Sequence, residues 1–284
     1  MTDEIVDCRA LTDDRLCAAM NAAFSDYVVP VTMTAETFTT FRLQRGFSAE
    51  HSFAVLADGD IAAFWFSSAP LPAYGNRAYT LSVGTDPAHR RKGLSRRLFQ
   101  AVVNKQKQAA GQGLQLEVIT TNRHAISAYE TFGFRTCRDL RICEVPANAG
   151  SSACLEGLTF ETARVEDLPV DETPFFDTDP TPQNARTALE GLTERVVIVV
   201  ARTDEEMLGW IAVYEDFSVA QLAVKKGRRR QGIGSALLRE VSRRMQAVTF
   251  RLVNVDRNAT ALNAFLDRAG AQDILRQYDM RLVF

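Results

Sequence analysis

The chain has 284 residues, of which 46% are hydrophobic and 24% charged, and its formal net charge is −2. This composition is typical of a globular protein with about two domains. The small net charge excludes a global basic field for nucleic acid, so each cluster of Lys and Arg needs a local reason. An acidic first segment and the lack of an apolar run of about 18 residues predict neither a secretory signal nor a membrane span.

The cysteine and histidine content bears on compartment and metals. Five cysteines without a CxxC pair predict reduced thiols in a cytoplasmic protein, not a disulfide framework or a zinc site. The three histidines are scattered and show no metal-ligand spacing. We therefore expect no resident metal and no membrane partner.

The first half of the chain alternates strand and helix patterns. The predicted elements are a hairpin over residues 52–70, a strand over 78–85, a helix over 94–108, a strand over 114–120 and a helix ending at Gly133. The hairpin has an Asp58-Gly59 turn, and the first of the two helices has one apolar face.

The second half repeats this order. The counterparts are a hairpin over residues 195–216, a strand over 218–224, a helix over 233–246, a strand over 248–255 and a helix ending at Gly270. Strands alternating with helices predict a mixed sheet with helical cover in each half, which is an α/β fold. A small, polar, unpatterned stretch separates the halves, so we place the domains at residues 1–146 and 158–284 and a linker at 147–157.

Each half carries a basic turn between its strand and its helix. The turns read HRRKG before residue 94 and KKGRRRQG before residue 233. Cations at a helix N-terminus are unfavourable, because that end already carries partial positive charge. A glycine turn that opens a helix presents backbone N–H groups to an anion and lets it approach closely. A single basic run is more often a solvated face, but its repetition at the same place predicts a polyanionic ligand such as a pyrophosphate.

Two motifs identify a family. Both turns contain Arg-x-x-Gly-x-small, with Arg90, Gly93 and Ser95 in the first copy and Arg229, Gly232 and Gly234 in the second. The first copy also carries N-x-x-A-x-x-x-Y-x-x-x-G-F, formed by Asn122, Ala125, Tyr129, Gly133 and Phe134. With these motifs the chain resembles the GNAT acetyltransferase superfamily, as two tandem copies over nearly the whole sequence. The resemblance implies that each domain is a mixed, mostly antiparallel sheet flanked by helices (α+β by some schemes).

The resemblance implies acetyl-CoA as co-substrate. Loop amides would bind its pyrophosphate, and a backbone N–H of the preceding strand would polarise the thioester carbonyl. In the first copy the expected binding residues are Val83, Thr85, Arg90, Arg91, Gly93, Leu94, Ser95, Arg96 and Asn122. In the second copy they are Leu222, Val224, Arg229, Arg230, Gly232, Gly234 and Ser235.

The resemblance also implies catalytic roles. Tyr129 matches the family's general acid, which protonates the departing thiolate; the alternative is an aromatic ring that packs beside the cofactor. The strand that often supplies the family's base has no glutamate here, so Glu117 on the next strand is a candidate, with a solvent-facing role or a water chain as alternatives. In the second copy the tyrosine position holds Phe265 or Leu266, depending on the alignment. We therefore expect the first domain to be catalytic.

The acceptor is not named by the sequence beyond an amine of a small molecule or peptide. Phe24, Tyr27 and Phe41 either line an apolar acceptor wall or belong to the core, which is the commoner role of aromatics at helical spacing. Acidic residues of the second half either attract a cationic amine or keep an irregular loop soluble; they are Asp171, Glu172, Asp177 and Asp179.

Two other functional classes compete with an N-acetyltransferase. The first is a non-catalytic acyl-CoA sensor or interaction protein, which the unequal second copy favours. The second is a nucleic-acid binder, which the short basic turns, the mildly acidic chain and the lack of aromatic–basic interleaving disfavour.

Overall fold

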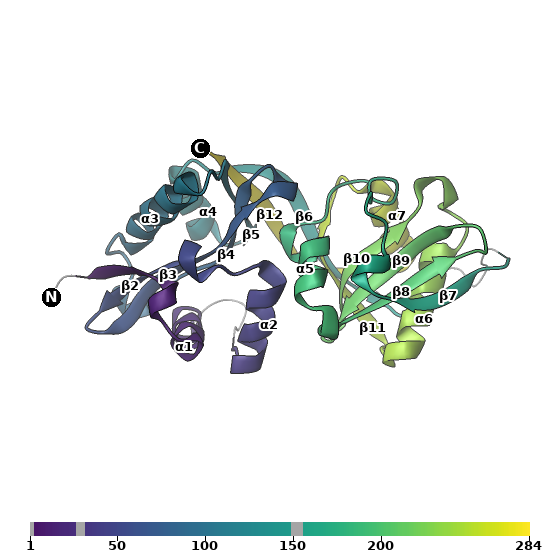
Figure 1. Cartoon of the computed structure of the whole chain (residues 1–284), viewed down its shortest axis with the longest axis horizontal. Helices are drawn as coiled ribbons and strands as arrows, with labels where there is room; N and C mark the ends of the chain where they lie inside the picture. The colour runs from purple at the N-terminus through teal and green to yellow at the C-terminus, as the bar shows by residue number, and fades with distance from the viewer. Residues whose placement is uncertain (1–2, 27–31, 149–155) are drawn as a thin grey trace. The chain divides into compact units, whose positions relative to one another are not determined.

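The computed structural model describes residues 3–26, 32–148 and 156–284. The chain forms two compact units, visible in Figure 1. The first unit consists of Met1–Cys137 with Asp279–Phe284, and the second consists of Arg138–Tyr278. Each unit contains a mixed sheet with helices on both faces, so the predicted fold class is confirmed.

Within the described residues, the first unit contains a sheet and four α-helices. Its strands, in spatial order, are β1 (Glu4–Asp7), β2 (Phe53–Ala57), β3 (Asp60–Leu71), β4 (Arg77–Thr85), β5 (Gly113–Ile119) and the end of β12 (Gln272–Val283). Its helices are α1 (Asp13–Ala23), α2 (Ala35–Arg45), α3 (Leu94–Gln108) and α4 (Arg123–Thr131). The β4–β5 pair is parallel, and the β1–β2, β2–β3 and β3–β4 pairs are antiparallel.

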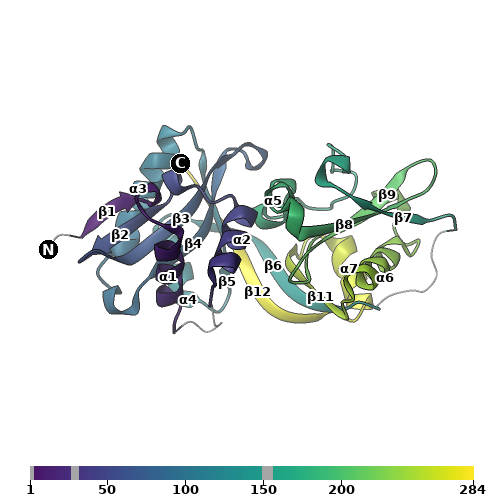
Figure 2. The ribbon, with the colours of Figure 1, turned by 60° about the horizontal axis from the view of Figure 1, so that its bottom comes forward.

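Strand β3 separates two cores in this unit. Phe64 and Phe66 belong to the cluster formed with α1 and α2, whereas the Trp65 ring lies 5.8 Å from that of Phe99 on α3. Successive side chains of a strand point to opposite faces, so α1 and α2 cover one face and α3 covers the other, as Figure 2 also shows. Phe24 and Phe41 pack into the α1–α2 core, which confirms the core alternative for them; Tyr27 lies outside the described residues.

The second unit repeats this plan. Its strands, in spatial order, are β6 (Arg135–Pro146), β11 (Thr249–Asp256), β10 (Ser218–Val224), β9 (Met207–Tyr214), β8 (Val196–Arg202) and β7 (Thr159–Ala163). Its helices are α5 (Arg186–Gly191), α6 (Ile233–Met245) and α7 (Thr260–Arg268). The β10–β11 pair is parallel, and β11 pairs antiparallel with β6.

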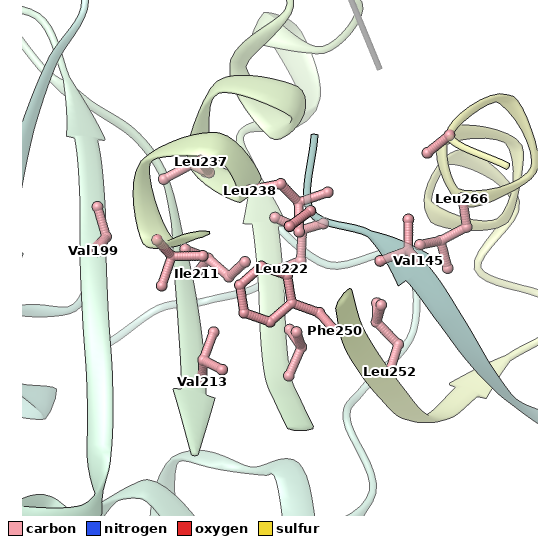
Figure 3. Packing of buried hydrophobic residues seen from close by; sticks show 14 of the residues in the cluster. Val145, Val199, Ile211, Val213, Leu222, Leu237, Leu238, Phe250, Leu252 and Leu266 are labelled. Atoms are coloured by element: carbon pink, nitrogen blue, oxygen red, sulfur yellow. The ribbon is translucent and has the colours of Figure 1, made fainter. Parts of the chain in front are cut away.

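The apolar face of α6 builds the larger core of this unit. Its predicted stripe, which includes Leu237 and Leu238, is buried. Figure 3 shows these side chains above Ile211 and Leu222 of the strands. Residues of the opposite parity on β9, such as Trp210, belong to a separate cluster that contains Leu189 of α5. The sheet is therefore buried on both faces.

Each sheet ends on a strand from the other half of the chain. In the first unit, Phe284 N–H donates to Gln112 O over 3.1 Å, beside the end of β12. In the second unit, β6 places Val145 opposite Phe250 of β11. The predicted boundary at residues 147–157 divides the chain where the first sequence repeat ends. The compact units divide it differently, because most of β6 belongs to the second unit and the end of β12 belongs to the first. Residues 149–155 of the predicted linker lie outside the described part of the chain.

Candidate functional site

Both basic turns adopt the same backbone conformation. In the first unit, Arg91 has φ 62° and Gly93 has φ 76°; in the second, Arg230 has φ 63° and Gly232 has φ 79°. A left-handed arginine is uncommon, because its Cβ crowds the backbone, and such strain is typical of functional loops. A left-handed residue followed by a helical one turns successive N–H groups toward one point, which is the geometry of an anion-binding nest.

The two helices that follow strengthen this anion site. Gly93 and Gly232 are the N-cap residues of α3 and α6, and neither supplies a side-chain cap. The first N–H groups of a helix have no partner within it, and here no Asp or Glu lies in either first turn. The partial positive charge of each helix end therefore faces the nest without a protein carboxylate beside it in the first turn.

Arg90 and Arg229 brace these turns through their side chains. Arg90 Nε donates to Thr85 O over 3.3 Å, and its guanidinium pairs with Asp26 over 2.7 Å. Arg229 Nε donates to Val224 O over 3.1 Å, and its guanidinium pairs with Asp177 over 2.5 Å. The hydrogen bond from Arg90 lowers the pKa of Asp26. The motif's first arginine thus fixes the turn to the preceding strand, and binding at this position falls to backbone groups.

The parallel strands of each unit part next to the turns. Strands β4 and β5 pair only from Arg77 to Tyr79 on β4, and β10 and β11 pair only at Ser218 and Val219 on β10. Beyond these pairs a gap opens between the strands, which we call the fork of each unit. In addition, β4 and β10 each contain a bulge just after the last pair.

The predicted carbonyl-polarising groups point into the forks. Asp86 N–H donates to Ala62 O on the β3 side, and Lys225 N–H donates to Leu208 O on the β9 side. Backbone groups alternate in direction along a strand, so the preceding N–H groups turn the other way. These are the N–H groups of Val83 and Thr85 in the first unit and of Leu222 and Val224 in the second.

The second unit contains a cavity of about 1020 Å³ that includes its turn and its fork. Every residue predicted to bind acetyl-CoA in the second copy lines it. It is large enough for a cofactor, since ligand pockets usually measure about 300–1,000 Å³. Residues that the sequence reasoning did not single out also line it; they include Asn184, Lys226, Asn254, Asp256 and Arg268.

In the first unit the predicted binding residues gather at the junction of β4 and α3. They belong to the end of β4, the turn with its short helix η4 (Pro87–His89), and the start of α3. Leu94 is buried under this junction. Asn122 lies at the start of α4, where its side-chain oxygen accepts from Ala125 N–H over 3.0 Å, so it fixes the position of the helix that carries Tyr129.

The two predicted catalytic residues lie on opposite faces of the first unit's sheet. The Tyr129 ring lies 6.2 Å from that of Trp65, on the α3 face. Glu117 accepts a hydrogen bond of 2.5 Å from the Tyr79 hydroxyl, and the Arg45 side chain of α2 also interacts with Tyr79. Glu117 is therefore not a solvent-facing strand residue. Burial raises the pKa of Tyr79 well above its usual value, and the Glu117 carboxylate adds to this, so Tyr79 stays a donor.

Matching hydrogen bonds settle which residue replaces the tyrosine in the second unit. Phe134 N–H donates to Tyr129 O, and Ala271 N–H donates to Leu266 O, both over 3.0 Å. Leu266 therefore occupies the tyrosine position, and its side chain is fully buried (Figure 3). By the same comparison Ala259, the N-cap of α7, occupies the position of Asn122.

Comparison with known proteins agrees with this geometry. Residues 18–134 match the Acetyltransferase (GNAT) family, and residues 194–270 match the Acetyltransferase (GNAT) domain. The chain belongs to the GNAT acetyltransferase family. The two GNAT matches fall in the two halves of the chain, as the repeated motifs predict.

A curated relative and two solved structures extend the likeness. Streptothricin acetyltransferase of Streptomyces lavendulae is 34% identical over 84 residues, which are 30% of this chain and 43% of that protein. The match thus spans less than half of the relative's length.

A tandem GNAT protein from the clavulanic acid biosynthesis pathway has a TM-score of 0.69 at 14% identity, over 99% of this chain and 98% of that one. A GCN5-related N-acetyltransferase from Sphaerobacter thermophilus has a TM-score of 0.69 at 20% identity, over 99% and 95%. At these identities the two structures show a shared tandem GNAT fold.

The described residues also bear on membranes and metals. Among them, no helix is both long and apolar enough to cross a membrane. Within the same ranges, no group of three or more His, Cys, Asp or Glu side chains is placed to hold a metal ion.

Proposed function

We propose that this protein is an acetyl-CoA-dependent N-acetyltransferase that transfers the acetyl group directly to an amine in a ternary complex. The observation that carries this proposal is the repeated turn, in which a left-handed arginine and a left-handed glycine direct backbone N–H groups to one point at a helix N-terminus. The diphosphate of CoA is an anion that such a nest accepts.

The fork beside each turn suits the rest of the co-substrate. With the diphosphate at the turn, the pantetheine arm would extend along the gap between the parted strands. N–H groups turned into that gap, such as that of Val83, would polarise the thioester carbonyl. The amine nitrogen then attacks the carbonyl carbon, the C–N bond forms and the C–S bond breaks. The amine loses a proton to a base, and the thiolate gains one from an acid.

The first unit offers side chains for both proton transfers. Tyr129 is the proposed acid for the thiolate, from the α3 face of the fork. Glu117 is the proposed base for the amine, from the opposite face, and its hydrogen bond with Tyr79 fixes the orientation of the carboxylate. An acid and a base on opposite faces of an open fork suit a donor and an acceptor that arrive from opposite sides.

A panel of amines with acetyl-CoA, read out as thiol release, tests the reaction. We include streptothricin because a partial relative is named for its acetylation. Thiol release that matches the amount of acetylated amine supports the proposal. Absence of thiol release with every amine would leave the alternative function, a non-catalytic acyl-CoA-binding protein, which Leu266 in place of a tyrosine favours for the second unit.

Two glycine substitutions test the binding site of each unit separately. Gly93→Glu and Gly232→Glu each place a carboxylate at the N-cap where the anion would bind. Calorimetric titration with CoA should show one site fewer in each variant and none in the double variant. Unchanged stoichiometry in the double variant would remove the two turns from carrier binding.

A further inference from the structure

A buried segment of the chain lies across the fork of the second unit. The segment runs from residue 181 to residue 184 and contains the short helix η6 (Pro182–Asn184). Asn184 Nδ2 donates to Val253 O on β11 over 2.7 Å, and Gln221 Nε2 on β10 donates to Asn184 O over 2.9 Å. Both contacts lie just beyond the last residues at which β10 and β11 pair. Asn184 therefore joins the two strands where the fork has parted them.

Further hydrogen bonds fix this segment, which we call the plug. Asn254 Nδ2 donates to Thr181 Oγ1 over 3.3 Å, and the Tyr214 hydroxyl donates to Gln183 O over 3.2 Å. The side chains of Thr181, Gln183 and Asn184 are all buried, although Asn184 lines the cavity. Freeing buried polar groups from their hydrogen bonds is costly, so these contacts hold the plug in place.

The residues before the plug tie it to the basic turn. Arg229 Nη2 donates to Phe175 O over 2.8 Å. The Asp177 carboxylate accepts from Arg229 Nη1 over 2.5 Å and from Ala261 N–H, at the start of α7, over 3.1 Å. The Phe175 ring lies 4.7 Å from that of Trp210, in the core cluster on the α5 face of the sheet. This stretch therefore covers the α5 face of the fork, whereas α6 and α7 line the cavity from the other face.

The charges around the cavity suit an anion. The Asp177 carboxylate is paired with Arg229, and Asp256 Oδ2 lies 3.7 Å from Arg138 Nη1, so both carboxylates are neutralised by arginines. Positive charge in a cleft attracts a diphosphate and repels a protonated amine. Three more cationic side chains line the cavity, namely Lys226, Arg230 and Arg268.

We infer that the second unit retains acetyl-CoA in a fork that is closed to acceptors. In the proposed reaction the donor and the acceptor arrive from opposite sides of the fork, and here the plug occupies the side opposite α6 and α7. The buried Leu266 also puts an apolar side chain where the first unit has its proposed acid. The carrier bound here is therefore not consumed, and occupancy of the site follows the carrier concentration, as in a sensor. This inference rests on the proposed function, because it takes the second turn as a carrier site.

The test measures chemical access to the bound thioester. Hydroxylamine attacks the carbonyl carbon of acetyl-CoA without an enzyme: a C–N bond forms, the C–S bond breaks, and the nitrogen loses a proton to water as the CoA thiolate leaves. The full-length Gly93→Glu variant is used, so that only the second turn binds the carrier. Its concentration is kept well above the Kd measured by calorimetry. The Gly93→Glu/Gly232→Glu double variant, in which both turns are blocked, is the control for unbound carrier.

We expect hydroxylamine to release thiol about tenfold more slowly with Gly93→Glu than with the double variant. Adding Asn184→Ala to Gly93→Glu removes the amide that reaches Val253 O and should abolish most of this protection, compared at equal occupancy by carrier. Asn258→Ala in the same background is the matched control and should keep the protection, because Asn258 is exposed and does not line the cavity. Gly93→Glu should also release no thiol with any amine of the panel.

Equal rates with the single and the double variant would overturn the inference, and this comparison decides it even if Asn184→Ala does not fold. Protection that survives in a folded Asn184→Ala variant, or amine-dependent thiol release by Gly93→Glu, would also overturn it. If the parent binds the carrier and Gly93→Glu does not, this inference fails and the first turn remains as a carrier site. Absence of carrier binding to the parent would refute the proposed function itself.

Discussion

Gly93→Ala separates the two reasons for a glycine in the first basic turn. The first is backbone conformation, since φ at this residue is 76°. A left-handed backbone costs a residue with a Cβ roughly 1–2 kcal/mol. The second is space, since a Cβ built here meets no heavy atom within 4 Å and so projects into the open region of the nest.

Gly93→Ala is therefore expected to change both the stability of the protein and its affinity for CoA, and the two changes have different causes. The backbone term predicts a loss of about 1–2 kcal/mol in the free energy of unfolding. In a protein of this size, that loss lowers Tm by about 2–4 °C per kcal/mol. The methyl group also keeps the diphosphate from the loop amides, so we expect the Kd for CoA to rise at least tenfold, or about 1.4 kcal/mol. The titration is made in the Gly232→Glu background, so that it reports only the first turn.

Gly59→Ala is the matched control. Gly59 has φ 90°, and its added Cβ also meets nothing within 4 Å, but it lies at the tip of the β2–β3 hairpin. This control should lose similar stability and keep its affinity for CoA. If Gly93→Ala binds CoA as tightly as its parent, or if Gly59→Ala weakens binding equally, then the turn is not the diphosphate site and the reasoning is refuted.

Three further predictions concern single side chains. Tyr129→Phe should lower kcat by about a hundredfold, the range of a general acid, without changing the affinity for CoA; steady-state kinetics across pH that match the parent would exclude the acid role. Leu266→Tyr should destabilise the protein by about 1–3 kcal/mol without adding activity, because the leucine is fully buried; denaturant titration and a thiol-release assay measure both. A hydrogen bond from Arg243 lowers the pKa of Glu240 to about 2 from its usual 4.5, so its stabilising effect is present above pH 4.5 and is lost as the pH falls toward 2. Glu240→Gln should therefore flatten the dependence of Tm on pH over that interval, and a variant with the parent's slope would contradict this.

Local patterns predicted the elements around the turns closely. The predicted helix over residues 94–108 coincides with α3, and the predicted helix over 233–246 is one residue longer than α6. Both start at a glycine that can adopt positive φ, and both have an apolar stripe of helical period, so local chemistry fixed their bounds. The positions of Val83 and Leu222 beside the forks follow from the same repeat.

Long-range pairing was not predictable from these patterns. The repeat shows that each copy ends in a strand. The alternation of apolar and polar side chains along β6 and β12 would fit the sheet of either unit. The local sequence therefore did not indicate which unit each strand joins. The bulge of β11 between Leu252 and Val255 was also hidden, because a bulge adds one residue without changing the character of a strand. The motif alignment could not decide between Phe265 and Leu266, because Asn258 and Gly270 lie one residue farther apart than Asn122 and Gly133. The hydrogen bonds of the helix end decide it.

The two units have therefore diverged at the fork and not at the turn. Both keep a bracing arginine–aspartate pair, a left-handed glycine and a left-handed arginine, and the arginine costs backbone strain. The same left-handed arginine in both copies is what we expect if both turns bind an anion, because a turn without a ligand would lose nothing by relaxing. The fork differs in chemistry, with Glu117 and Tyr79 in the first unit and Asn254 among amides in the second. Two sites that bind the same carrier but differ in the access of an acceptor would keep the same turn and differ at the fork.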